Sequence, residues 1–400
     1  MIHGLIWLAL GVMVWLGSAG MSAAAEWAAE PRLSVKGEFN SNLLLTGRPH
    51  KSVYGLWTSP ELNLRRTSER TNLIGHAHLD VVKYVNNKNL DMIQQFYNAT
   101  VRHRMELHEF GLTGNYSRDS VLLGELVQTG VVGQVNLVGR RRFRKRQSLQ
   151  PTWNYQIAER WASSVNYNFT NVTYDVPPGS GFLDFRTHSG GVRLSHNLFE
   201  NTEVYASGQV ISFAARDVAN SSLSYGGESG GTYNWTERLK VSVFGGGRFV
   251  KTTLASRGIT QKTDRTVGVF GGTVNYQWED YQGNLSASRS LNPSALGLLT
   301  KTDRVAVTLS GDVTEKVMVA FTGSVINNTT IANNQVLIPK TRFFSLQPSL
   351  QWRWHEQWGL KATYQYRHLE QKGQGPNVVA DSQSVTLMLS YVYPRLAVSE

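Results

Sequence analysis

Apolar and polar residues alternate along most of the chain. In the stretch SVTLMLSYVY, Val385, Leu387 and Leu389 fall on one face, and Thr386 and Ser390 fall on the other. A period of two predicts a β-strand. The same alternation recurs in WASSVNYNF, LKVSVFGGGRF, VAVTLSGDV and KVMVAFTGSV. No helix longer than two turns is predicted after the first 25 residues.

The connections between these runs alternate in length, short and then long. About eighteen runs of roughly 9–14 residues are found, within a range of 16–20, and this length suits tilted membrane strands. The short connections are TSER, LHE, AER, FEN, TER, WEDY, TEK and HEQW. The long ones are 46–52, 85–92, 117–141, 174–185, 214–222, 253–264, 290–302, 327–341 and 370–382. This pattern predicts an all-β, transmembrane, antiparallel up-and-down β-barrel with both termini on the short-turn side.

Two hairpins have similar sequences. SLQPTWNYQIAERWASS (148–164) and SLQPSLQWRWHEQWGLK (345–361) each read as a strand, a tight turn and the next strand. Aromatic residues gather beside the short turns, and such rings prefer the membrane interface. The predicted girdle comprises Trp153, Tyr155, Trp161, Trp235, Trp278, Tyr281, Trp352, Trp354 and Trp358. A soluble β-sandwich or propeller is the alternative, but outward faces this apolar would suit a soluble protein poorly.

Composition narrows the function. The 400 residues contain no Cys, which excludes disulfides, thiolate metal sites and cysteine nucleophiles. The net charge of +11 suits nucleic acid, anionic lipid or an anionic solute. Nucleic acid is not expected, because its binding motifs are absent and the N-terminus resembles an export signal.

The first 25 residues differ from the rest of the chain. LIWLALGVMVWLGSAG is a continuous apolar run, and small residues follow it up to Ala25. This predicts a cleaved signal peptide at 1–25 and a single barrel domain at 26–400. An uncleaved membrane anchor is the alternative, which the small-residue run disfavours. No later stretch approaches the roughly 18 apolar residues of a membrane helix.

The hairpin LQPTWNYQIAERWASSVNYNF resembles bacterial outer-membrane β-barrel proteins, and more narrowly a porin-like family often found beside exopolysaccharide and PEP-CTERM gene clusters. The resemblance covers nearly all of 26–400. It implies a Gram-negative outer membrane with short periplasmic turns and long extracellular loops. It also implies contact with outer-membrane lipid and lipopolysaccharide, and insertion by the barrel-assembly machinery. In a departure from such proteins, which usually end on an aromatic residue, SYVY is followed by PRLAVSE. Either Tyr391 and Tyr393 serve as an internal signal or the final strand is misplaced.

If the apolar face meets lipid, the alternate positions face inward. The cations expected to line the lumen are Arg65, Arg102, Arg104, Arg142, Arg144, Arg146, Arg193, Lys240, Arg248, Arg353, Lys361 and Arg367. Fewer acids are expected there: Glu38, Glu61, Asp80 and Asp312. A ladder of guanidinium groups favours the entry of anions. In the alternative reading, the arginines pair with inward acids and brace the wall.

Other chemistry is weakly indicated. His76, His78 and Asp80 alternate on one strand face, which is a metal-like spacing, but polar wall lining is favoured. No metal site, cofactor or catalytic residue is expected, because neither a nucleophile elbow nor a phosphate loop is present. The connection 117–141 is long and apolar. It is read as a pore constriction, a cover for the outer mouth, or two extra strands.

These patterns predict an outer-membrane, porin-like channel with a basic lumen that passes anionic solutes or an acidic exopolysaccharide. The first alternative is a structural sheath for a periplasmic partner, such as a cytochrome or a secretion complex. The chain has no CxxCH, so any haem would belong to that partner. An enzyme on a barrel is a further alternative, and it lacks an identifiable nucleophile.

Overall fold

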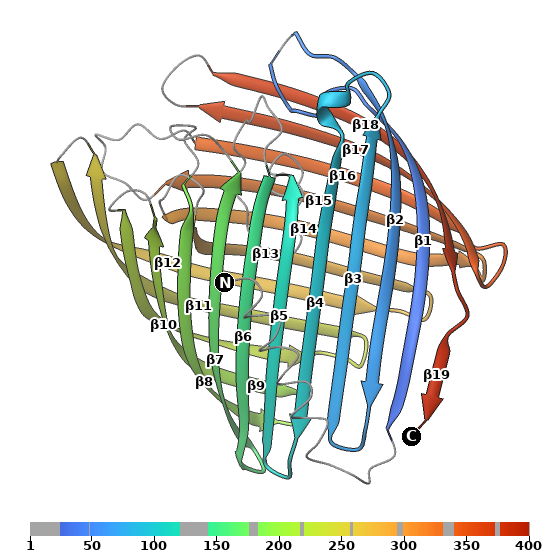
Figure 1. Ribbon diagram of the computed structural model, residues 1–400. Helices are drawn as coiled ribbons and strands as arrows, with labels where there is room; N and C mark the ends of the chain where they lie inside the picture. The colour runs from blue at the N-terminus through green and yellow to red at the C-terminus, as the bar shows by residue number, and fades with distance from the viewer. Residues whose placement is uncertain are drawn as a thin grey trace.

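The computed structural model describes residues 25–47, 49–120, 143–175, 183–216, 220–256, 259–293, 299–330, 340–372 and 377–399. They form one antiparallel sheet in which each strand from β1 to β17 pairs with the next along the chain, and β18 pairs with β1 to close an 18-strand barrel (Figure 1). The predicted fold class is confirmed. The signal-peptide prediction for 1–25 lies outside the described residues, apart from Ala25.

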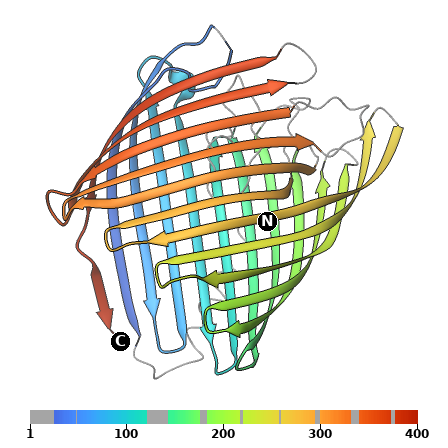
Figure 2. The same cartoon turned by 180° about the vertical axis from the view of Figure 1, so that it is seen from behind.

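The strands are mostly 13–19 residues long. Those of the near wall cross those of the far wall steeply, as in a barrel of tilted strands (Figure 2). The strands are β1 (Glu26–Asn40), β2 (Val53–Thr67), β3 (Thr71–Tyr84), β4 (Met92–Arg104), β5 (His108–Ser120), β6 (Phe143–Ala158), β7 (Trp161–Asp175), β8 (Phe185–Phe199), β9 (Thr202–Ala215), β10 (Ser221–Asn234), β11 (Leu239–Ser256), β12 (Ile259–Gln277), β13 (Tyr281–Pro293), β14 (Leu299–Thr314), β15 (Val317–Thr330), β16 (Lys340–Trp352), β17 (Trp358–Lys372), β18 (Val378–Val392) and β19 (Leu396–Ser399). The 3₁₀ turn η1 (Lys88–Leu90) lies between β3 and β4.

The predicted short turns all join consecutive strands at one end of the barrel, and the longer connections lie at the other end. The structure assigns 117–120 to β5, so that part of the expected loop 117–141 is strand. The remainder, 121–141, lies outside the described residues, as do the roles suggested for it.

The seam between β1 and β18 explains the unusual C-terminal sequence. β18 pairs with β1 from Arg32↔Val392 to Asn40↔Ser384, so the final predicted strand is in place. The short β19 then pairs with the remaining part of β1, Glu26–Ala29. The residues after SYVY therefore cover the edge of β1 that β18 leaves unpaired, and an unpaired edge would be a site for association.

The two faces of the wall differ in chemistry. Leucine, valine and aromatic side chains on the outward face are well exposed, including Leu33, Val35, Leu56, Val192, Val210, Leu285, Leu309, Leu350 and Leu387. Serine, threonine, asparagine and charged residues alternate with them and face inward. An apolar exterior around a polar interior is the pattern of a membrane-spanning barrel. No helix among the described residues is long and apolar enough to cross a membrane.

The wall is least regular where β12 meets β13. These strands pair only between Phe270–Gln277 and Gln282–Arg289. β12 begins eleven positions earlier, at Ile259, and this upper part pairs with β11 instead. The two strands therefore separate on the long-loop side of Phe270, where β12 rises away from β13 (Figure 2).

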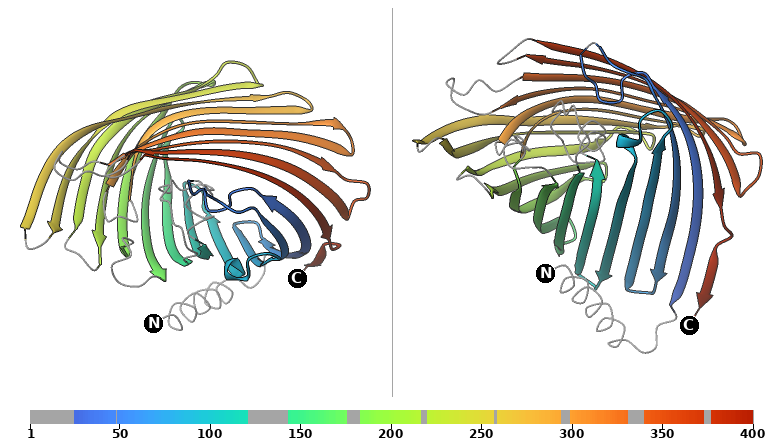
Figure 3. Two further views of the ribbon diagram at one scale, coloured as in Figure 1. Left: turned by 90° about the horizontal axis from the view of Figure 1, so that it is seen from above. Right: turned by 45° about the horizontal axis from the view of Figure 1, so that its top comes forward.

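The connection between β1 and β2 folds back onto the inner wall. Seen from above, it lies within the outline of the barrel (Figure 3, left). Leu43 joins a buried apolar cluster on β2–β4 that includes Trp57 and Tyr84. Leu45 joins a second cluster on β15–β18, with Phe343 and Leu369. We call residues 41–47 the seam loop, because it bridges both sides of the β18–β1 seam.

Candidate functional site: the barrel interior

The strand register shows where the predicted lumen cations lie. Arg65, Arg102, Arg104, Arg144, Arg146, Arg193, Lys240, Arg248, Lys361 and Arg367 each stand in register with other inward residues. Arg353 follows β16 in a short turn. Arg142 lies outside the described residues. Apart from Arg367, these inward cations fall into two groups, which differ in whether an acid faces them.

In the braced group, an acid on the adjacent strand accepts a hydrogen bond from the guanidinium. Arg144 on β6 donates to Asp119 on β5 at 2.7 Å, and both side chains are largely buried. Arg248 on β11 donates to Glu228 on β10 at 2.9 Å, and also to Gln209 on β9. Charge-assisted bonds of this kind fix the wall and neutralise its charge locally.

Two further pairs lie near the short turns. Arg193 donates to Glu203 at 2.8 Å, and its guanidinium lies 3.6 Å from the ring centre of Tyr205. Arg104 pairs with Glu109 at 3.1 Å. For these cations the wall-bracing alternative describes the geometry.

The partner acids were missed by the sequence analysis. Asp119 was assigned to a loop, and Glu109 and Glu203 stand beside short turns, where alternation is hard to phase. Glu228 lies within GGESGG, where no apolar neighbours reveal which face is inward. Asp119, Glu109, Glu203 and Glu228 therefore join the expected inward acids Glu38, Glu61, Asp80 and Asp312.

In the unpaired group, no described residue forms an ion pair with the cation. This group comprises Arg65, Arg102, Arg146, Lys240 and Lys361, on β2, β4, β6, β11 and β17. They are spread around the interior wall rather than gathered at one point. No carboxylate of the described residues lies within ion-pair distance of these cations.

Arg367 differs from the expected water-facing position. It faces inward but is only 2% exposed, next to the seam loop. Its Nη2 donates to Ser382 Oγ at 2.9 Å, and that hydroxyl donates to Asn40 Oδ1 at 3.0 Å. Asn42 continues the network to the backbone of Asp381. Arg367 therefore holds the seam together, and nearly all of its side chain is covered.

His76 and His78 lie next to each other on the inward face of β3. His76 lies 3.2 Å from Glu61, and His78 lies 3.0 Å from Asp80, which also accepts a bond from Ser59. These contacts satisfy the side chains within the wall. No group of His, Asp and Glu among the described residues has an arrangement that could hold a metal ion.

A cavity of about 350 Å³ lies in the interior between the β1–β5 wall and the β16–β18 wall. Its lining mixes charges: Lys36, Glu38, Asp80, Asp119, Lys361 and Arg367, together with Trp57, Phe96 and several amides and hydroxyls. Lys36 Nζ lies 3.5 Å from the centre of the Trp57 ring, a cation–π contact. The interior can therefore contact ionic solutes directly.

The seam loop reduces the interior at the long-loop end. Leu43 and Leu45 are fully buried, and Leu45 adopts a φ of 47°. A left-handed backbone costs a leucine roughly 1–2 kcal/mol. Such a conformation persists only where surrounding contacts hold it. The sequence carried no signal for this loop beyond three consecutive leucines.

The predicted girdle residues lie on the outward face at the short-turn end. Trp153 and Trp161 are about two-fifths exposed, and Trp235 is more so. Trp354 stacks on Trp358 and packs at a tilt against Trp352, and Trp358 also contacts Tyr391. Tyr233, Tyr276, Tyr391 and Tyr393 extend the same band, although the sequence analysis did not include them.

Comparison with known proteins gives similarity at the level of fold. No family model matches the sequence, and no curated protein matches it. The ferric citrate transporter FecA has a TM-score of 0.50 and 10% identity, covering 87% of this chain and 60% of FecA. OccAB4 of Acinetobacter baumannii has 9% identity and a TM-score of 0.46, covering 93% of this chain and 98% of OccAB4. OccK5 (OpdH) of Pseudomonas aeruginosa has 9% identity and a TM-score of 0.41, covering 92% and 98%.

The closed barrel, its apolar exterior and the likeness to FecA together define the class. The chain has the porin-like fold of outer-membrane β-barrels.

Proposed function

We propose that this protein is an outer-membrane channel whose basic interior favours anionic solutes. The observation that carries the proposal is the unpaired group of inward cations: Arg65, Arg102, Arg146, Lys240 and Lys361. The braced cations contribute little net charge, because each already faces a carboxylate. The unpaired cations leave a positive potential along the interior.

The chemistry of the side chains supports this assignment. Arginine stays charged at any physiological pH, and its fork matches carboxylate and phosphate oxygens. Fixed positive charge on a pore wall raises the local concentration of anions and lowers the barrier to their passage. A cation would meet the opposite effect. The wall therefore favours anions without needing a specific binding site.

We further propose that the solutes are small. The seam loop occupies part of the interior, which favours small anions over a thick polymer. An acidic exopolysaccharide is the larger alternative substrate. FecA is a ferric citrate transporter and Fiu of E. coli K12 is a ferric-catecholate import receptor. We propose transport for this chain as well, but we do not propose that it carries ferric citrate or ferric catecholates.

The test is the reversal potential of the processed chain, residues 26–400, in a planar bilayer across a KCl gradient. We expect a stable conductance with a reversal potential on the anion-selective side. The variant Arg102→Ser/Arg146→Ser/Lys240→Ser should move this potential towards zero. Arg238→Ser is the matched control, because Arg238 lies in a short turn and pairs with Glu279 there. A correctly folded barrel that conducts no ions would contradict the proposal.

A further inference from the structure

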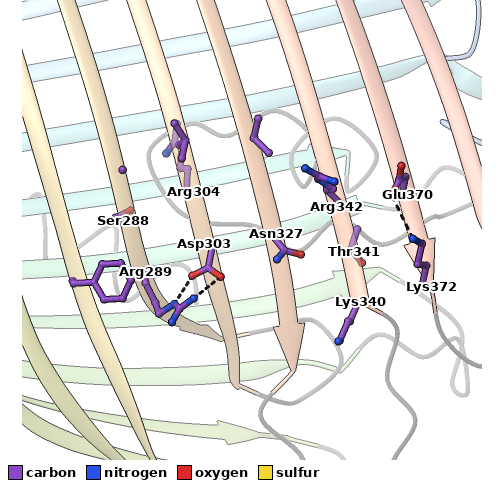
Figure 4. Close-up of a pocket in the computed structure, with 14 residues that line it drawn as sticks. Ser288, Arg289, Asp303, Arg304, Asn327, Lys340, Thr341, Arg342, Glu370 and Lys372 are labelled. Carbon is purple, nitrogen blue, oxygen red and sulfur yellow. Dashed lines mark hydrogen bonds and ion pairs between the residues drawn. The ribbon is translucent and has the colours of Figure 1, made fainter.

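A shallow pocket of about 480 Å³ lies on the outer surface of the barrel, across β12–β17 (Figure 4). The register places Arg289, Asp303, Asn327, Arg342 and Glu370 in one outward-facing row across β13–β17. These residues share a face with the lipid-facing side chains, so the pocket does not belong to the interior.

Cations outnumber acids on this outward row and its rim. Arg289 forms a two-pronged pair with Asp303, and Lys372 lies 3.9 Å from Glu370. Lys340 and Arg342 form no ion pair with any described residue. Figure 4 shows both beside the paired groups. With four cations facing two carboxylates, the pocket keeps a positive charge.

The floor of the pocket is apolar. Phe270, Ala287, Val305 and Val325 line it, and the Arg289 guanidinium lies 5.0 Å from the Phe270 ring centre. This floor begins where β12 separates from β13. The pocket therefore combines cationic groups with an adjoining hydrophobic surface, which is the complement of an anionic lipid.

The height of the pocket fits a lipid headgroup. Arg342 precedes the girdle residue Trp352 by ten residues on β16, and Arg289 follows the girdle residue Tyr281 by eight residues on β13. At about 3.4 Å per residue and a tilt of 35–45°, these spacings correspond to about 19–28 Å along the membrane normal. That is about the height of the apolar band, so the cations reach the headgroups of the opposite leaflet.

Other outward cations occur close to the same end of the barrel. They are Lys83, Arg118, Lys145, Arg186, Lys251 and Lys262. A basic surface at this level attracts anionic headgroups at roughly 1 kcal/mol per cation. The pocket on β12–β17 adds an apolar floor to this general attraction.

We propose that this pocket binds the phosphate groups of a phosphorylated glycolipid in the outer leaflet. The headgroup phosphates lie between Arg342, Lys340 and Lys372, and an acyl chain lies over the floor at Phe270. The inference rests on the membrane location and not on ion conduction. Free phosphate shares the headgroup chemistry, so the test must separate the two sources.

The experiment measures binding of lipid A bearing two phosphates to the protein purified in detergent, by native mass spectrometry. The test variant is Lys340→Gln/Arg342→Gln. The matched control is Arg66→Gln/Arg238→Gln, which removes two cations at the short-turn end, far from the pocket. Each pocket cation should contribute roughly fivefold to affinity, so we expect the test variant to bind roughly 25-fold more weakly. The control should bind like the parent protein.

Two competitors identify the ligand. Dephosphorylated lipid should bind as weakly to the parent as lipid A binds to the test variant, and millimolar inorganic phosphate should not displace lipid A. Equal affinities for the test and control variants would overturn the proposal. Displacement by inorganic phosphate would assign the site to a free anion instead. Channel conductance should be the same in the test variant and the parent, which separates this outcome from that of the proposed function.

Discussion

Arginines that all point inward have different roles in this barrel. The role of each depends on the residue that faces it on the neighbouring strand. Arg144 faces Asp119 and is buried with it. Arg102 stands opposite Asn72 and Gly111, which carry no charge. The first is part of the wall structure, and the second contributes charge to the interior. Alternation predicts the direction of both side chains, but it does not predict their partners.

Replacing Arg144 should therefore affect stability. Arg144→Gln leaves the Asp119 carboxylate, which is 5% exposed, without its counter-charge. Loss of one partner of a buried pair typically costs about 3–5 kcal/mol. The measurement is the urea midpoint for unfolding of the refolded barrel in lipid vesicles. Arg102→Gln is the control and should leave the midpoint unchanged, since no pair is broken. If the urea midpoint falls equally in the two variants, the Arg144–Asp119 pair does not stabilise the barrel.

Asp91, in the connection between β3 and β4, should make that connection sensitive to acid. Its carboxylate accepts hydrogen bonds from the Tyr84 backbone N–H at 2.8 Å and from Lys83 Nζ at 3.1 Å. These bonds hold the pKa of Asp91 below its usual value. The stabilisation is complete above the unfolded-state pKa, and it is lost as the pH falls through the lowered value.

Hydrogen-exchange protection of the Tyr84 amide should accordingly decline as the pH falls below about 4, the usual pKa of an aspartate. In Asp91→Asn, the protection should be lower at neutral pH and nearly independent of pH. A parent protein whose Tyr84 protection does not change with pH would contradict the assignment.

At the scale of whole strands, the sequence predicts the architecture well. Strand number, short turns and outward faces follow from a period of two and from turn residues. The prediction is weakest where side chains are small. In β10, GGESGG offers no alternation, so Glu228 and the tight approach to β11 were not foreseen. β19 was missed because four residues beyond a proline carry too little pattern to predict a strand.

Substitutions at two adjacent glycines in β11, Gly246 and Gly247, can test how closely β11 approaches β10. A Cβ on Gly246 would strike the Gly227 carbonyl oxygen and lie 2.6 Å from the Glu228 Cα, whereas a Cβ on Gly247 would meet open space. Gly246→Ala should destabilise the barrel by about 1–3 kcal/mol, as overpacking does. Gly247→Ala should stay within about 0.5 kcal/mol. Urea unfolding of both variants makes the comparison, and equal midpoints would show that β10 and β11 are not crowded.

For the molecule as a whole, the interior is defined by two kinds of contact that a local pattern cannot predict. Cross-strand pairs decide which charges are neutralised. The seam loop depends on contacts between Leu43, Leu45 and strands that are distant in sequence. The barrel follows from local alternation, whereas the properties of its interior follow from this long-range packing.

The seam loop should therefore limit conduction through the proposed channel. Leu43→Ala/Leu45→Ala removes the buried side chains that attach it to both sides of the seam. Truncation of a buried leucine typically costs about 2–5 kcal/mol, which is enough to release a short loop from the wall. We expect single-channel conductance to rise and the open level to become noisier.

Leu56→Ala is the control for this variant, since Leu56 lies on the outward face of β2 and is 51% exposed. Its conductance should match that of the parent. If the double variant folds and conducts like the parent, the loop lies beside the ion path rather than in it. Selectivity would then depend only on the wall cations, because the loop residues that reach the interior contribute no charge.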